Sequence, residues 1–284
     1  MGRLTHWNQE MQSLAGNFVF RCLPPYRSRL LAHWTSGGMK LGPFEKWLFT
    51  GLSNALDRRY YAPTATTAER EWIKELCMAG SSAIGWAKHY LSLGFPDKHT
   101  PALAMFPEIE KALASGVVRT VHQVACCSGR EIAWFAQRYP GLRFVGSDCD
   151  EPLVRFLREH WKQLPNLAFE LVRLEKESPR DAALLKCDLL YASGGFHYMD
   201  TASLQRFFER VKPLAARLYL SQPMNRSYSP ITEPVSQGRG MLSWNHPYPA
   251  LLIRAGWTNV RVAEGFVEEL PHFKNVAVFA DSPS

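Results

Sequence analysis

The chain has 284 residues, of which 46% are hydrophobic and 12% aromatic, and its net charge is +7. These values describe a globular protein with a domain-sized core and exclude a disordered chain. No apolar run reaches the ~18 residues of a membrane span, and polar residues stand where a signal peptide would be apolar. We therefore expect a cytoplasmic protein that does not associate with membranes.

The basic residues and the cysteines limit the partners. The basic residues are scattered along the chain and form no dense stripe, which argues against nucleic acid and favours anionic small molecules. The six cysteines lack Cys-x-x-Cys spacing, so they indicate reduced thiols. Cys126, Cys127 and Cys149 have no well-spaced fourth ligand, and we therefore predict no metal site.

The first part of the chain has helical periodicity. Apolar residues recur three and four apart over residues 42–58 and 66–80. A further helix is expected to end at Gly94, and a short one to run over residues 106–116. Residues 1–116 are therefore predicted to form a helical module.

From residue 117 onward, short apolar strands alternate with amphipathic helices. Strands are expected over residues 119–125, 142–147, 168–173, 187–192, 216–221, 258–264 and 274–280. This alternation predicts an α/β fold in residues 117–284, with a doubly wound, mostly parallel, seven-stranded sheet. Only "VEELPHF" separates the last two strands, which indicates an antiparallel pair at one edge.

The stretch "VHQVACCSGR", residues 121–130, has the outline of a nucleotide-binding strand–turn–helix unit with most of its glycines missing. Asp148 follows the second strand and lies 19 residues after Gly129. Ligands in such sheets bind at the carboxyl ends of the strands, where a carboxylate can accept hydrogen bonds from both hydroxyls of a ribose. Asp150 is predicted to cap the next helix.

Five stretches in register resemble the class I S-adenosylmethionine-dependent methyltransferases over residues 119–280. They are "VHQVACCSGR", "RFVGSDCD", "CDLLYASGGFHYMD", "VKPLAARLYLSQP" and "YPALLIRAGWTNVRV". The resemblance implies this family's fold and S-adenosylmethionine as the cofactor.

The departures from the family lie in the first stretch. Gln123 replaces the usual acidic residue, while Ala125 and Cys127 replace two glycines. A cofactor without phosphates tolerates these small side chains better than a dinucleotide does, because the backbone need not reach a pyrophosphate. The resemblance assigns cofactor binding to Gln123, Ala125, Cys126, Cys127, Gly129, Asp148, Cys149 and Ser193.

The loops that follow the strands carry the candidates for chemistry. His197, Tyr198 and His246 are the predicted catalytic residues, because a base or positioning group for methyl transfer should come from these loops. Tyr60, Tyr61, Arg226 and Tyr248 are predicted to bind substrate. Residues 1–116 are expected to cover the substrate as a lid.

The substrate is expected to be a small molecule whose acceptor atom, O, N or C, the sequence does not specify. Two alternatives stay open. One is aminocarboxypropyl transfer from the same cofactor, as in nicotianamine synthase-like enzymes. The other is a catalytically silent protein that binds an adenosyl cofactor. A homodimer is also compatible with the sequence.

Overall fold

The computed structural model describes residues 42–78, 83–96, 105–175, 178–240, 242–266 and 272–283, with isolated residues between 11 and 30. The chain divides into two compact units. One comprises Met1–Gly85 and Gly240–Leu242, and the other comprises Trp86–Arg239 and Ser243–Ser284. Among the helices of the described ranges, none combines the length and the hydropathy that crossing a membrane requires.

In the first unit, two helices are joined by a short turn. Helix α3 (Pro43–Tyr60) buries the leucines of the predicted apolar stripe, Leu48, Leu52 and Leu56, whereas Phe44 at its start is exposed. Helix α4 (Thr67–Met78) follows it. The Arg59 guanidinium pairs with the Glu69 carboxylate at 2.9 Å, and Arg70 donates to the Tyr60 carbonyl at 3.0 Å. These bonds fix the turn between the two helices.

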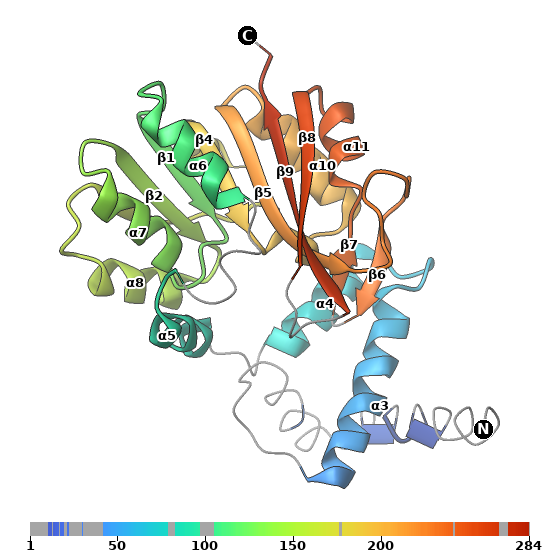
Figure 1. Cartoon of the computed structure of the whole chain (residues 1–284). Helices are drawn as coiled ribbons and strands as arrows, with labels where there is room; N and C mark the ends of the chain where they lie inside the picture. Colours follow the sequence, from blue (N-terminus) through green and yellow to red (C-terminus); the bar gives the residue numbers. More distant parts are fainter. Residues whose placement is uncertain are drawn as a thin grey trace. The chain divides into compact units, whose positions relative to one another are not determined.

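The second unit is built on a seven-stranded sheet with the order β3-β2-β1-β4-β5-β9-β8 (Figure 1). Its strands are β1 (Thr120–Val124), β2 (Arg143–Asp148), β3 (Leu167–Leu171), β4 (Cys187–Ser193), β5 (Ala215–Asn225), β8 (Thr258–Phe266) and β9 (Phe273–Asp281). The first five pair in parallel, and β9 pairs antiparallel with both β5 and β8. The predicted doubly wound, mostly parallel sheet is confirmed.

The predicted antiparallel pair at one edge of the sheet is confirmed. Within this pair β9 is the inner strand, because it also pairs with β5 along its whole length, from Arg217↔Asp281 to Asn225↔Phe273. Only β8 is an edge strand at that side.

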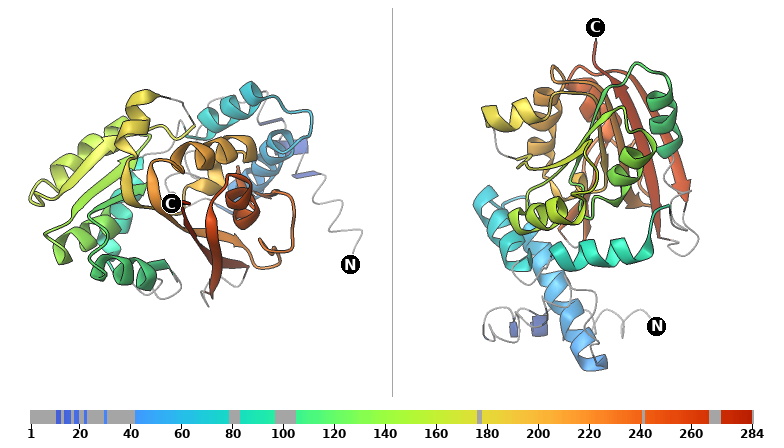
Figure 2. Two further views of the ribbon diagram at one scale, coloured as in Figure 1. Left: turned by 90° about the horizontal axis from the view of Figure 1, so that it is seen from above. Right: turned by 90° about the vertical axis from the view of Figure 1, so that its left-hand side faces the viewer.

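Helices cover both faces of the sheet. The chain first crosses from β1 to β2 and β3 on one side, and then to β4 and β5 on the other side of β1. These helices are α6 (Met105–Ala114), α7 (Arg130–Arg138), α8 (Glu151–His160), α9 (Pro179–Leu184), α10 (Thr201–Val211) and α11 (Tyr248–Arg254), and α5 (Ala83–Leu93) precedes them in the chain. Right-handed crossovers that run in opposite directions place their helices on opposite faces. In Figure 2 the gold α10, which connects β4 to β5, and the green α6, which precedes β1, lie on opposite sides of the sheet.

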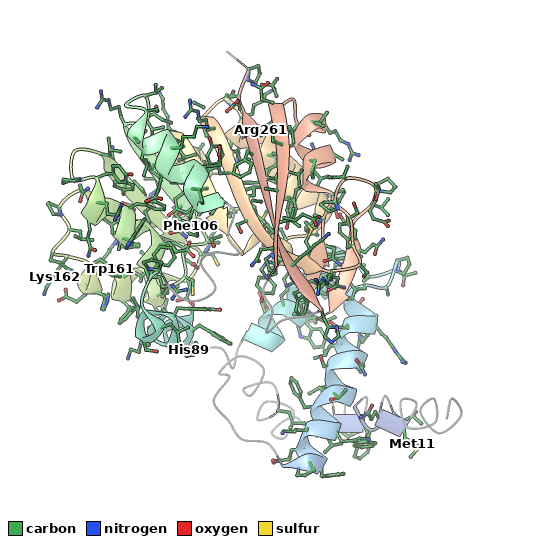
Figure 3. The ribbon with its side chains drawn as sticks, viewed as in Figure 1. Met11, His89, Phe106, Trp161, Lys162 and Arg261 are labelled. Carbon is green, nitrogen blue, oxygen red and sulfur yellow. The ribbon has the colours of Figure 1, made fainter. Side chains whose placement is uncertain are left out.

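Helix α6 belongs to the sheet unit. Its Phe106, labelled in Figure 3, stacks on Phe135 of α7 with ring centroids 5.7 Å apart. The unit that contains the sheet therefore begins at Trp86, earlier than the predicted boundary at residue 117. Whether residues 1–116 act together as a lid stays a prediction.

Short elements and caps complete the strand-end loops. The Asp150 carboxylate accepts from the Leu153 N–H at 2.7 Å, which confirms the predicted cap of α8. A 3₁₀ turn, η2 (Phe196–Tyr198), follows β4. Two short strands, β6 (Gln237–Gly240) and β7 (Ser243–Asn245), pair with each other after β5.

Candidate functional site

The turn after β1 keeps a glycine-like backbone although most of its glycines are gone. Ala125 has a φ of 51°, Cys127 of 48° and Gly129 of 65°, so all three lie in the left-handed region. A residue with a Cβ pays about 1–2 kcal/mol for this conformation. Such strain persists where surrounding structure imposes it, and it is concentrated at functional sites. The turn therefore has the left-handed backbone of a glycine-rich turn although two of these three residues carry a Cβ.

Hydrogen bonds and close packing hold this shape. Cys126 N–H donates to the Ser147 carbonyl at 2.9 Å, and Gly129 N–H donates to the Cys126 carbonyl at 2.8 Å. Trp161, labelled in Figure 3, donates from Nε1 to the Ser128 carbonyl at 3.2 Å. A Cβ at position 129 would lie 2.7 Å from the Phe169 ring. Only glycine therefore fits at position 129.

A second glycine turn meets the first from the end of β4. Gly194 and Gly195 have φ values of 84° and 87°. A Cβ on Gly195 would lie 2.5 Å from the Ala125 Cβ. The side chain gained at position 125 is thus accommodated because position 195 has none.

Asp148, at the end of β2, is oriented by backbone donors. Its Oδ2 accepts from Cys127 N–H at 3.1 Å, and its Oδ1 accepts from Cys149 N–H at 2.8 Å and, more weakly, from Asp150 N–H at 3.4 Å. Desolvation raises the pKa of this carboxyl, and these N–H groups act in the opposite direction. The carboxylate is thereby fixed beside the turn, where the sequence predicts it.

Gln123 takes part in a network that the sequence does not reveal. Its Nε2 donates to Glu131 Oε2 at 2.7 Å, and its Oε1 accepts from the Tyr191 hydroxyl at 3.2 Å. The Ser193 hydroxyl donates to Glu131 Oε1 at 3.1 Å. Gln123 and Tyr191 are buried. A carboxylate from the first turn of α7 thus joins the ends of β1 and β4.

His197 lies in η2 with a defined tautomer. Gln222 Nε2 donates to the Gly194 carbonyl at 3.0 Å, so its Oε1 faces His197 Nδ1 at 3.3 Å. Nδ1 must therefore carry the hydrogen, which leaves the lone pair of the neutral ring on Nε2. Burial, followed by the Arg239 charge, lowers the pKa of His197 to about 3. The ring is neutral at pH 7.

His246 is engaged at both ring nitrogens. Nε2 lies 3.1 Å from the Met199 carbonyl, and Nδ1 lies 2.8 Å from the Ser236 hydroxyl. The ring is buried, and burial lowers its pKa to about 4. These bonds tie the loop after β7 to η2 and fit a structural role. The catalytic role predicted for His246 stays a prediction.

Tyr198 and Tyr248 differ in exposure. Tyr198 is 52% exposed and lies against the His197 ring with centroids 4.1 Å apart. Tyr248 is fully buried in the core under α10 and α11, and its hydroxyl has no hydrogen-bond partner among the described residues. Tyr198 is therefore accessible to a ligand, whereas Tyr248 would need the core to open.

The C-terminal part of α5 contributes to the same region. Arg130 Nη1 donates to the carbonyls of Tyr90, at 3.1 Å, and Gly94, and its guanidinium lies 5.3 Å from the Tyr90 ring centroid. Desolvation raises the pKa of Tyr90, and electrostatic interactions with Cys127 and Tyr198 raise it further. The Tyr90 phenol therefore lies near the turn and η2.

The remaining predicted residues lie elsewhere. Arg226 follows β5, has an exposed side chain and donates from its backbone N–H to the His272 carbonyl at 2.9 Å. Tyr60 and Tyr61 belong to the first unit, where Tyr60 is buried and the Tyr61 hydroxyl accepts from Gly240 N–H at 3.2 Å. Substrate binding by these residues stays a prediction.

The thiols near the turn are not activated. Burial, followed by the Asp148 charge, raises the pKa of Cys127 to about 12, and burial raises that of Cys126 well above its usual value. Protonated thiols are poor nucleophiles and poor metal ligands. Within the described ranges, no three His, Cys, Asp or Glu side chains converge as metal ligands do.

Sequence reasoning missed Glu131, Gln222, Tyr90 and Arg239 as site residues. Glu131 had one detectable signal, an acidic residue in the first turn of the helix that follows the glycine-poor turn. Arg239 lies in the polar, glycine-containing strand β6, and its charge lowers the pKa of both His197 and His246 after burial.

Comparisons with known proteins agree with this geometry. Residues 121–216 match the family model described as a methyltransferase domain. No curated protein sequence matches the chain. Among solved structures, the chain is similar to the CurJ carbon methyltransferase, with a TM-score of 0.56 and 13% identity, covering 87% of this chain and 72% of that one.

Two further structures have the same fold. One is the 1,6-didemethyltoxoflavin-N1-methyltransferase of Burkholderia thailandensis with 1,6-didemethyltoxoflavin and S-adenosylhomocysteine bound. It has a TM-score of 0.51 and 16% identity, covering 78% of this chain and 93% of that one. The other is the N-terminal domain of EvdMO1 with S-adenosylhomocysteine (SAH) bound. It has a TM-score of 0.50 and 16% identity, and the match covers 72% of this chain and 86% of that one. At these identities the likeness establishes the fold.

Proposed function

We propose that this chain, which carries a class I S-adenosylmethionine-dependent methyltransferase domain, transfers the methyl group of that cofactor to a small molecule. One observation carries the proposal. The turn after β1 keeps left-handed backbone at Ala125, Cys127 and Gly129, although two of the three residues are not glycine. A turn without function would be expected to relax from this strain.

The residues present fit this cofactor. Ala125 and Cys127 add small side chains, which a cofactor without phosphates tolerates, and the Asp148 carboxylate is held to accept hydrogen bonds from ribose hydroxyls. The cofactor supplies a methyl group on a sulfonium centre. The protein then has to orient the acceptor in line with that group and exclude water.

His197 is the proposed proton acceptor for an acceptor group that must lose a proton. Its neutral ring presents the Nε2 lone pair, and the Gln222 amide fixes the ring. A pKa of about 3 makes it a weak base, so it acts best on a proton that the acceptor already releases as its bond to the methyl group forms. Tyr198 and Tyr90 are proposed to position the acceptor.

The substrate class is proposed from the fold neighbours and from the charge pattern. The Burkholderia thailandensis enzyme was crystallised with the small molecule 1,6-didemethyltoxoflavin, and the CurJ domain is named a carbon methyltransferase. The acceptor atom is left open between O, N and C. The cytoplasmic location and the homodimer stay predictions.

Calorimetry on the full chain tests the cofactor. We expect S-adenosylhomocysteine to bind and NAD to give no heat, because the turn lacks the glycines that a pyrophosphate needs. An absence of heat with S-adenosylhomocysteine, or binding of NAD in its place, would contradict the proposal.

Product analysis tests the reaction. The protein is incubated with methyl-labelled S-adenosylmethionine and a pool of small metabolites, and the label is expected in a small molecule with S-adenosylhomocysteine as the by-product. Methylthioadenosine as the by-product would indicate aminocarboxypropyl transfer. In parallel incubations with a protein pool and an RNA pool, label in either macromolecule and in no small molecule would refute the small-molecule assignment. Cofactor binding without turnover of any of the three pools would favour the silent alternative.

A further inference from the structure

The end of β1 lacks the carboxylate that the resemblance leads one to expect, and Gln123 does not replace it directly. The Gln123 side chain is buried, its Oε1 accepts from the Tyr191 hydroxyl, and its Nε2 donates to Glu131. The amide oxygen, the atom that could accept from a cation, is therefore already bonded inside the protein. Gln123 instead holds a neighbouring carboxylate.

That carboxylate belongs to Glu131 in the first turn of α7. Gln123 donates to its Oε2 at 2.7 Å, and Ser193 donates to its Oε1 at 3.1 Å. One donor comes from β1 and the other from the end of β4, so the carboxylate lies over two neighbouring parallel strands. Its charge reaches the turn, because it contributes to the raised pKa of Cys127 after burial and Asp148.

The arrangement of charges follows the strand order. Asp148 ends β2 and Glu131 bridges β1 and β4, so the two carboxylates lie on opposite sides of the turn after β1. A ribose at Asp148 places the adenosyl end of the cofactor at β2. The methionyl end then lies toward β1 and β4, and it carries a primary ammonium group.

We propose that the Glu131 carboxylate, oriented by Gln123 and Ser193, binds the ammonium group of the cofactor's methionyl moiety in place of the acid missing at position 123. The inference rests on the proposed function, because it takes S-adenosylmethionine as the ligand. The hydrogen bonds from Gln123 and Ser193 orient this carboxylate, and its negative charge is what attracts an ammonium group. The negative charge has thus moved from the strand to the following helix.

The test compares two ligands on one protein. S-adenosylhomocysteine has the ammonium group, whereas methylthioadenosine has the same adenosyl end without the amino acid. In Glu131→Gln, which keeps the shape of the side chain, we expect Kd for S-adenosylhomocysteine to rise about tenfold to a hundredfold, the range for a hydrogen bond to a charged group. Kd for methylthioadenosine should not change.

Matched variants separate this role from a general effect. Glu151→Gln removes an exposed carboxylate from the first turn of α8 and should change neither affinity. The exchange Gln123→Glu with Glu131→Gln returns a carboxylate to the strand and should recover most of the affinity for S-adenosylhomocysteine. If Glu131→Gln fails to fold, Ser193→Ala should still raise Kd for S-adenosylhomocysteine about fivefold and leave Kd for methylthioadenosine unchanged.

The outcomes distinguish the two proposals. If Glu131→Gln weakens the affinity for both ligands equally, or for neither, the proposed role of Glu131 is overturned. The assignment of the cofactor would still stand. If the unmodified chain binds neither ligand, the cofactor assignment itself fails.

Discussion

Adding one methyl group at Gly195 should destabilise the protein strongly, because two costs coincide there. Gly195 has φ 87° and ψ −47°, a conformation that residues with a Cβ rarely adopt and that costs of order 1–3 kcal/mol. The new Cβ would also lie 2.5 Å from the Ala125 Cβ, and overpacking of this kind costs about 1–3 kcal/mol. We expect Gly195→Ala to lower the free energy of unfolding by about 2–6 kcal/mol.

Three further variants divide this loss into its parts. Gly116 has φ 73°, and no heavy atom would lie within 4 Å of a Cβ added there. Gly116→Ala should therefore lower the free energy of unfolding only by the cost of the left-handed conformation, about 1–2 kcal/mol. Combining Ala125→Gly with Gly195→Ala removes the contact and should recover about 1–3 kcal/mol. Ala125→Gly alone should be close to neutral, because relief of left-handed strain offsets the entropy of glycine.

Urea denaturation of the four variants measures these values, and the coupling between positions 125 and 195 is the quantity of interest. The reasoning would be refuted if the double variant were as unstable as Gly195→Ala. It would also be refuted if Gly195→Ala cost no more than Gly116→Ala.

Three further predictions concern the site. Asp148→Ala should weaken binding of S-adenosylhomocysteine by about 1.5–3 kcal/mol, measured by calorimetry, and an unchanged affinity in a folded variant would remove Asp148 from the site. Cys127→Gly should leave that affinity equal or tighter, because position 127 has φ 48°, whereas a tenfold loss would reveal a contact of the thiol. Buried His122, His197 and His246 have pKa values of about 4, 3 and 4, so the unfolded chain, with histidine pKa near 6.5, binds more protons than the folded one below that pH. Stability should therefore fall as pH falls from about 6.5 toward 4, by up to about 4 kcal/mol per pH unit, and a flat urea-denaturation profile would contradict this.

The sheet was predictable because its central strands, such as β1 and β4, are almost entirely buried. In the sequence, buried parallel strands are short runs of apolar residues between helices. The seven strands of the sheet lie where those runs predict them. The short pair β6 and β7 was not predicted, since Gln237–Gly240 is polar and contains two glycines. The place of β9 between β5 and β8 depends on pairing between distant segments, which local patterns do not encode.

The site was predictable only in outline. The position of Asp148 follows from its place after an apolar strand, and the backbone donors that hold it agree with that reading. The role of Glu131 depends on the direction of its side chain, which spacing alone does not give. For His246 the sequence gives the place in a strand-end loop, but it does not give the hydrogen bonds that engage both ring nitrogens.

The order of strands in the sheet differs from the order in which a ribosome makes them. Strand β8 leaves the ribosome before β9, yet β9 is its partner in the sheet and also lies between it and β5. Until β9 has emerged, β5 presents an open apolar edge and β8 has no place to dock. A five-stranded sheet without the β8–β9 pair would have an exposed edge at β5, the kind of surface that pairs with other chains. The β8–β9 hairpin closes that edge in one late step.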